Sequence, residues 1–153
     1  MHGKFVAAMV LAISAVSATA AQSQTTTSTW DGVYTDAQAA RGSAKYAQCA
    51  MCHGASLEGS GEAPPLTGRF IPDWVGTTLA DLFDKIQTTM PLFAPGTLSA
   101  GDTTDLIAFL LKANNFPAGA NELASSVDVL KTVSFDAAKP RTDTKAVRSM
   151  PKR

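Results

Sequence analysis

The sequence predicts an all-α fold of three to four helices joined by long loops. Three segments repeat apolar residues at the i, i+3, i+4, i+7 spacing that forms one face of a helix. No stretch alternates apolar and polar residues over a useful length, so strands are not expected. The loops are long and rich in Gly and Pro, and three helices with such loops do not bury a core by themselves. We therefore expect the loops to wrap a large apolar ligand.

The chain begins with the pattern of a secretory signal over residues 1–20. A short polar start with His2 and Lys4 precedes an apolar run, and Ala18-Thr19-Ala20 supplies the small residues of a cleavage site. We expect export to the periplasm and no membrane span after cleavage. An uncleaved anchor is the alternative, although the run is short for a spanning helix and no basic stop follows it. Residues 21–29 are polar and of low complexity, which predicts a flexible leader.

The first helix is predicted to begin at an N-cap and to run into Cys49. Thr35 and Gln38 have the three-residue spacing of a capping box. The face of this helix consists of Ala39, Gly42, Ser43 and Tyr46.

The second and third helices have similar start signals. Thr78 precedes Asp81 by three residues, and Ser99 precedes Asp102 by three, so Thr78 and Ser99 are the predicted N-caps. Asn114-Asn115 and then Pro117 end the third helix. Their apolar faces consist of Leu79, Leu82, Phe83 and Ile86 in the second helix, and of Leu106, Phe109, Leu110 and Ala113 in the third.

The folded domain is expected to cover residues 30–131, ending in a short fourth helix or packed arm with Leu123, Val127 and Leu130. Residues 132–153 are predicted to form a basic, disordered tail. Six basic residues and one acidic residue follow from Lys139 onward, whereas residues 21–138 hold six basic and twelve acidic ones. Such a run of charged residues is usually solvated and has no binding function. The alternative is steering toward an acidic partner or anionic lipid.

The total charge gives no reason to expect a nucleic-acid partner. Thirteen basic side chains balance thirteen acidic ones over 153 residues, and only 17% of the residues are charged.

The segment Cys49-Ala50-Met51-Cys52-His53 is the strongest chemical signal in the chain. The C-x-x-C-H pattern is the attachment signal for c-type haem. Two thiols three residues apart on a helix reach the two vinyl groups of one porphyrin, and the adjacent His53 becomes the proximal iron ligand. A redox dithiol and a plain disulfide are the alternatives, but the βαβ context of a thioredoxin-like dithiol is absent. We predict one covalent haem c.

The remaining ligands follow largely by elimination. Signal cleavage removes His2, so Cys49, Cys52 and His53 are then the only thiol or imidazole ligands, too few for a structural zinc site within one chain. Met51 lies between the tethered cysteines and Met150 lies in the tail, which leaves Met90 as the sixth ligand. Pro91 favours an extended backbone at Met90 and helps aim its side chain. The alternative is that Met90 only fills a gap in the core.

Ligation by His53 and Met90 has a functional consequence. A thioether is a soft, neutral ligand that raises the reduction potential, and the two ligands leave no open position on the iron. The sequence therefore predicts an electron carrier and not an enzyme. A haem enzyme or gas sensor would require Met90 to be absent from the iron or labile.

Several motifs together resemble the class I c-type cytochromes, and more closely the small periplasmic cytochromes associated with quinoprotein (PQQ-dependent) dehydrogenases. They span residues 30–119. C-x-x-C-H alone indicates only c-type haem, and the Met-Pro loop with the last helix narrows the resemblance to class I. The motifs are WDGVYTDAQAARG at 30–42, CAMCHG at 49–54, APPLTG at 63–68, TTMPLFAPGTLS at 88–99 and LIAFLLKANNFPAG at 106–119.

The resemblance implies a class I cytochrome c fold, in which Gly42 and Tyr46 of the first helix cross Leu106 and Phe109 of the last. It also implies that the Pro64 carbonyl accepts the Nδ1–H of His53, with Pro65 as the neighbouring choice. Trp74 resembles the indole that donates to a haem propionate, but an ordinary core Trp is the equal alternative. The chain departs from the family at Asn115, where Gly is common, and in its basic tail.

The resemblance implies redox proteins as partners. The donor would be a quinoprotein dehydrogenase, and the acceptor a terminal oxidase or another cytochrome. The leading hypothesis is a monohaem electron carrier that meets each partner through a small, transient interface. The alternative is an electron-accepting cytochrome subunit tightly bound to a quinoprotein dehydrogenase.

Overall fold

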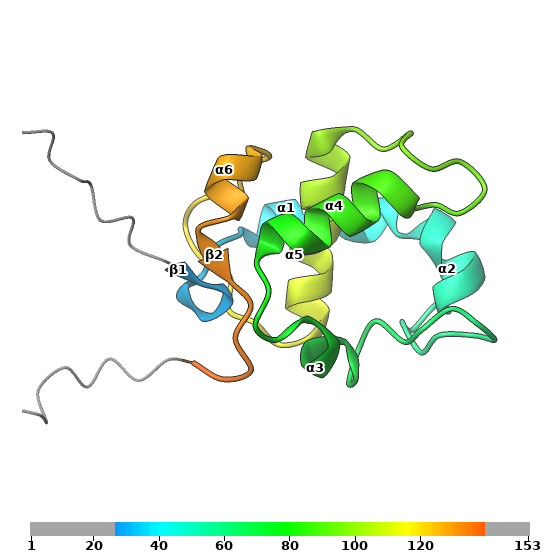
Figure 1. Cartoon of the computed structure of the whole chain (residues 1–153), viewed down its shortest axis with the longest axis horizontal. Helices are drawn as coiled ribbons and strands as arrows, with labels where there is room; N and C mark the ends of the chain where they lie inside the picture. The colour runs from blue at the N-terminus through cyan, green and yellow to red at the C-terminus, as the bar shows by residue number, and fades with distance from the viewer. Residues whose placement is uncertain (1–26, 140–153) are drawn as a thin grey trace, which may run out of the picture.

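The computed structural model describes residues 27–139 and confirms the all-α prediction (Figure 1). Six α-helices follow one another, with a short 3-10 helix and a two-stranded sheet beside them. The predicted signal, residues 21–26 of the predicted leader and the predicted tail beyond 139 lie outside the described residues. The elements are β1 (Thr27–Ser28), η1 (Thr29–Asp31), α1 (Asp36–Lys45), α2 (Ala47–His53), α3 (Phe70–Trp74), α4 (Leu79–Thr89), α5 (Ala100–Ala113), α6 (Val127–Leu130) and β2 (Val133–Ser134).

Helices α1 and α5 make the most extensive helix contact in the described region. Gly42 lies at the crossing, where a Cβ built on it would meet the Asp105 carbonyl oxygen at 1.9 Å. The rings of Tyr46 and Phe109 pack beside it with centroids 5.2 Å apart. A glycine is needed here because the two backbones approach more closely than any side chain permits.

The predicted N-caps all form. The side chains of Thr35 and Ser99 accept hydrogen bonds from the backbone N–H of the residue three positions on, and Thr78 forms a capping box with Asp81. Helix α4 packs across α5 and contacts α6, so Leu79, Leu82 and Leu130 become fully buried. These caps are local interactions within one turn, which is why the sequence predicts them.

The first predicted helix is interrupted, which corrects the expectation of one helix running into Cys49. Helix α1 ends at Lys45 and α2 begins at Ala47, with Tyr46 at the junction. The Tyr46 N–H donates to the carbonyls of both Gly42 and Ser43, so the turn tightens there. The break turns the C-x-x-C-H segment away from the axis of α1, and α2 lies at one end of the molecule in Figure 1.

The ordered region is wider than the expected domain of residues 30–131. Strand β1 pairs in parallel with β2, joining Thr27 to Val133 and Ser28 to Ser134. Phe135 is fully buried, and the Trp30 indole donates to the Asp136 carbonyl oxygen at 2.9 Å. The last residues of the predicted leader and the first of the predicted tail therefore belong to the fold, because they bury each other's backbone and aromatic side chains. They lie at the end opposite α2 (Figure 1).

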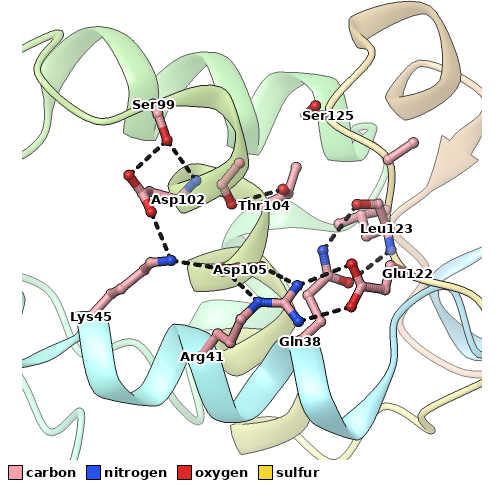
Figure 2. Close-up of a pocket in the computed structure, with 12 residues that line it drawn as sticks. Gln38, Arg41, Lys45, Ser99, Asp102, Thr104, Asp105, Glu122, Leu123 and Ser125 are labelled. Atoms are coloured by element: carbon pink, nitrogen blue, oxygen red, sulfur yellow. Dashed lines mark hydrogen bonds and ion pairs between the residues drawn. The ribbon is translucent and has the colours of Figure 1, made fainter.

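A network of charged side chains covers the α1–α5 crossing (Figure 2). Arg41 donates to both carboxylate oxygens of Asp105, at 2.9 and 3.1 Å, and also to Glu122. Lys45 bridges Asp102 and Asp105 at 2.7 and 2.8 Å. The Asp105 side chain is only 8% exposed, and two cations on α1 balance its charge.

No helix within residues 27–139 combines the length and the apolar character needed to cross a membrane.

Candidate functional site

A largely apolar cavity of about 520 Å³ lies at the α2 end of the molecule, a volume in the range of small-molecule and cofactor sites. Its walls come from α2, α3, α4 and α5 and from the loops that follow α2 and α4. The apolar wall residues include Phe70, Leu82, Ile86, Leu98, Leu106 and Leu110. The Gly- and Pro-rich loops thus enclose a cavity, as their composition suggested.

The whole C-x-x-C-H segment faces this cavity except Ala50. Cys49, Met51, Cys52 and His53 line it. Within the described residues neither cysteine takes part in a disulfide, and burial, followed by the nearby Cys52, raises the pKa of the Cys49 thiol. His53 ends α2 and is buried. One short helix therefore presents two thiols and an imidazole to the same apolar space.

The His53 ring is held by a backbone carbonyl. Its Nδ1 lies 2.9 Å from the Pro64 oxygen, which is the contact that the resemblance implied, and the neighbouring Pro65 makes no such contact. With the proton on Nδ1, this bond fixes the ring and leaves Nε2 as the free basic nitrogen. Among the described residues no hydrogen bond involves Nε2 of His53. The imidazole can therefore act as a ligand toward the cavity.

Met90 lines the same cavity from the far end of α4. It caps that helix with φ −119° and ψ 148°, the extended backbone predicted from the following proline. Pro91 is buried, which anchors the start of the loop. The structure thus brings the His53 imidazole and the Met90 thioether, 37 residues apart in the chain, to one cavity.

Trp74 is a half-buried wall residue on α3. Its ring packs against Phe70 with centroids 6.3 Å apart. Within residues 27–139 its indole N–H makes no hydrogen bond, unlike the indole of Trp30. The side chain can therefore offer a donor to a polar group in the cavity.

Two polar side chains that the sequence did not identify as part of the site form hydrogen bonds to the loop that carries Pro64. The Tyr46 hydroxyl donates to the Gly54 carbonyl oxygen at 2.7 Å, and the Asn114 amide donates to the Leu66 carbonyl oxygen at 2.8 Å. Burial, followed by the charges of Cys49 and Glu58, raises the pKa of Tyr46 to about 12. Helical spacing marked Tyr46 only as a packing residue and Asn114 only as a stop, because neither partner is visible in the local sequence.

Part of the chain matches a known family of proteins. Residues 37–110 match the family model described as cytochrome C oxidase, cbb3-type, subunit III. These residues, just under half of the 153-residue chain, are therefore similar to a cytochrome c domain. The match includes α1, the C-x-x-C-H segment, Met90 and most of α5.

The chain was also compared with curated proteins and with solved structures. A search of curated proteins gives no match to the chain. Among solved structures, the chain is similar to the crystal structure of the sulfane dehydrogenase SoxCD from Paracoccus pantotrophus. The identity is 22% and the TM-score 0.47, over 81% of this chain and 73% of that one.

The cofactor of the cytochrome c domain is haem c, and the fold is that of a class I cytochrome c. The residues present fit this group. The cavity is mostly apolar, Cys49 and Cys52 have the spacing of the haem-attachment motif, and an oriented imidazole stands beside them. A domain of this kind is typical of an electron carrier.

Proposed function

We propose that the protein is a periplasmic monohaem electron-transfer protein whose haem c is ligated by His53 and Met90. The observation that carries this proposal is the convergence of two thiols, one imidazole and the Met90 thioether on a single apolar cavity. Haem c supplies a reversible one-electron couple. The protein residues determine its reduction potential and which ligands can reach the iron.

Each residue of the site has a separate role in this proposal. Cys49 and Cys52 hold the cofactor through thioether bonds, so it stays attached in both redox states. The Pro64 carbonyl fixes the orientation of the His53 ring and raises its basicity as a ligand. Trp74 donates to a propionate through its indole N–H. None of these residues needs to move when an electron is gained or lost.

Ligation by Met90 distinguishes an electron carrier from a haem protein that binds oxygen or a substrate at the iron. A neutral sulfur ligand stabilises the ferrous state and raises the potential, and the apolar walls act in the same direction because they disfavour extra positive charge. With His53 and Met90 both bound, no position is open to oxygen or a substrate. This occupancy favours a carrier over a haem enzyme or gas sensor.

The location and partners complete the proposal. The signal-like residues 1–20 support export and cleavage after Ala20. The resemblance to cytochromes beside quinoprotein dehydrogenases supports such an enzyme as the electron donor, with a terminal oxidase or another cytochrome as acceptor. Single electrons would pass between these redox proteins through transient contacts.

Replacing Met90 with Ala tests the proposal in the purified, haem-loaded protein. The ferric wild-type protein is expected to show the sulfur-to-iron charge-transfer band, and Met90→Ala is expected to lose it and to lower the reduction potential, because a soft ligand is removed. The reduced variant should also bind carbon monoxide rapidly. Optical spectra of both redox states and a redox titration provide the measurements.

Met51→Ala is the matched control, since Met51 lines the same cavity but is 79% exposed and lies between the two cysteines. It should retain the band and the slow reaction with carbon monoxide. Persistence of the band in Met90→Ala would assign the sulfur ligand to another residue and overturn the proposed ligation.

A further inference from the structure

The loop from Gly54 to Leu66 carries the carbonyl that orients His53. It leaves α2 directly after His53 and has no helix of its own. Backbone hydrogen bonds shape it from within and from α2. The Gly59 N–H donates to the His53 carbonyl at 2.8 Å, and the Leu66 N–H to the Leu57 carbonyl at 2.8 Å. The Leu57 N–H donates to the Gly54 carbonyl at 3.3 Å, and Ser60 and Ala63 exchange bonds of 3.1 and 3.0 Å. A Cβ on Gly59 would lie 2.9 Å from the Pro64 carbonyl carbon, so the two arms of the loop touch. The position of Pro64 therefore depends on how the ends of the loop are held.

A side chain between α1 and α2 holds the first end. Tyr46 is 5% exposed and stands at the junction of α1 and α2. Its hydroxyl donates to the Gly54 carbonyl at 2.7 Å, one residue after His53. The ring itself is fixed against Phe109 of α5. This contact ties the exit of the haem-attachment segment to the helix crossing.

A side chain at the end of α5 holds the second end. Asn114 is 5% exposed, and its amide nitrogen donates to the Leu66 carbonyl at 2.8 Å and to the Leu110 carbonyl at 2.9 Å. The first bond spans 48 residues and joins the last long helix to the loop. Asn114 does not line the cavity, so it has no direct contact with the space that the cofactor takes.

We infer that Tyr46 and Asn114 are positioning residues that together set the hydrogen bond between His53 Nδ1 and the Pro64 carbonyl. The inference rests on the proposed ligation by His53. The two side chains pin Gly54 and Leu66, which are the two ends of the segment that carries Pro64, to the packed pair α1 and α5. The α1–α5 crossing thereby controls the electronic character of the iron ligand through two neutral hydrogen bonds.

The sign of the effect follows from the chemistry of imidazole. Donation from Nδ1–H to a carbonyl makes Nε2 more basic, and a more basic ligand stabilises the ferric state. Loosening either end of the loop weakens that donation. The reduction potential should then rise, and the Nδ1 proton of His53 should exchange faster with solvent.

Tyr46→Phe and Asn114→Ala test the inference in the haem-loaded protein. Both variants are expected to raise the reduction potential and to speed the exchange of the His53 ring proton, measured by redox titration and by NMR. Tyr46→Phe removes a single oxygen atom and leaves the ring on Phe109, so it remains a usable test if Asn114→Ala folds poorly. Tyr46 lines the cavity, so its replacement could change the potential through cavity polarity. Asn114 does not line the cavity, so a raised potential in Asn114→Ala cannot have that cause.

Tyr34→Phe and Gln38→Ala are the matched controls. The Tyr34 hydroxyl donates to the Phe116 carbonyl at 2.7 Å, and the Gln38 amide bonds to the backbone of Leu123 at 3.0 and 2.8 Å. Both side chains are buried and neither lines the haem cavity. These variants should lower the melting temperature while leaving the potential and the ring proton as in the wild type.

The inference is overturned if Tyr46→Phe and Asn114→Ala behave as the controls do, with lower melting temperatures and an unchanged potential and ring proton. That result would leave ligation by His53 and Met90 intact. A wild-type protein without the sulfur-to-iron band would instead contradict the proposed function, so the two failures are distinguishable.

Discussion

Gly42 shows how one residue determines the approach of two helices. A Cβ at this position would lie 1.9 Å from the Asp105 carbonyl oxygen and 2.8 Å from the Phe109 Cβ. Neither neighbour can swing aside, because one is backbone and the other is the first atom of a packed ring. Any larger residue must push α1 away from α5, and that movement would also disturb Tyr46 one turn later.

Replacing Gly42 with Ala should therefore destabilise the protein. Overpacking of this kind costs about 1 to 3 kcal/mol, and a clash with backbone atoms at 1.9 and 2.5 Å belongs to the upper part of that range. That cost exceeds the roughly 1 kcal/mol that Ala normally gains over Gly within a helix. Urea unfolding followed by circular dichroism measures the change. Gly101→Ala is the control: its Cβ would find only the Ser99 hydroxyl, at 3.9 Å, so stability should stay the same or rise. Equal effects in the two variants would contradict the crossing argument.

The backbone conformation at Asn115 explains why Asn can stand where Gly is common in the class I cytochromes that the sequence resembles. It follows the C-cap of α5 and has φ +65°, in the left-handed region that glycine adopts most easily. Asn tolerates this conformation better than other residues with a side chain. The substitution therefore preserves the helix end.

At the scale of elements, the charged network links α1 to α5 and to the segment after α5. Burial acts to raise the pKa of Asp105, but hydrogen bonds from Arg41 and Lys45 outweigh it and lower the pKa overall. Lys45, and after it Ser99, lower the pKa of Asp102. Arg41 also reaches Glu122, so one guanidinium joins three parts of the chain (Figure 2).

These shifts predict that stability decreases in acid. The unfolded chain has Asp groups with a pKa of about 3.9, and the folded values of Asp102 and Asp105 lie lower, so the unfolded state binds more protons. Their contribution is complete above the unfolded pKa and is lost as the pH falls through the folded pKa. Melting temperatures between pH 3 and pH 7 should fall toward the acid end.

Asp105→Asn should weaken that dependence. It removes the carboxylate that faces both Arg41 and Lys45, so stability at pH 7 should fall by about 1 to 3 kcal/mol and vary less with pH. Asp128→Asn is the control, since this side chain is 94% exposed and lies 3.9 Å from Lys131, and surface pairs contribute little. An unchanged acid slope in Asp105→Asn would show that the network is not its source.

At the scale of the whole molecule, the two ends of the described region pair with each other at the end of the fold away from α2 (Figure 1). Phe135 is fully buried and packs edge-on against Phe70, with centroids 5.9 Å apart, and against Phe116 at 5.3 Å. Phe70 also lines the cavity. The residue directly after β2 therefore supports the wall of the haem site through its contact with the Phe70 ring.

Phe135→Ala should destabilise the protein by about 3 to 5 kcal/mol, because it deletes a fully buried aromatic ring and leaves a cavity. Thermal unfolding of the haem-loaded protein measures the loss. Val129→Ala provides the control, as this side chain is 45% exposed and its truncation should cost little. A small effect of Phe135→Ala would mean that the residues beyond 131 are only peripheral.

The helix starts and the haem motif were accessible from the sequence because they depend on neighbours within a few residues. The side chains of Thr35 and Ser99 bond to backbone one turn away, and Thr78 bonds to the Asp81 side chain three positions on. C-x-x-C-H is a contiguous pattern. Met90 could be selected by elimination because the chain offers few sulfur or imidazole ligands. The break at Tyr46 was not predicted, since the helical spacing continues through it.

The sequence by itself determined the cofactor, the helical class and the candidate ligands, because covalent attachment and axial ligation each require particular residue types. Only the tertiary structure decided how the site is held. The bond from Tyr46 to Gly54 depends on the break between α1 and α2, and the bond from Asn114 to Leu66 joins residues 48 positions apart. The β1–β2 pair links residues separated by 106 positions. Such contacts form only when distant segments pack together, so no local pattern encodes them.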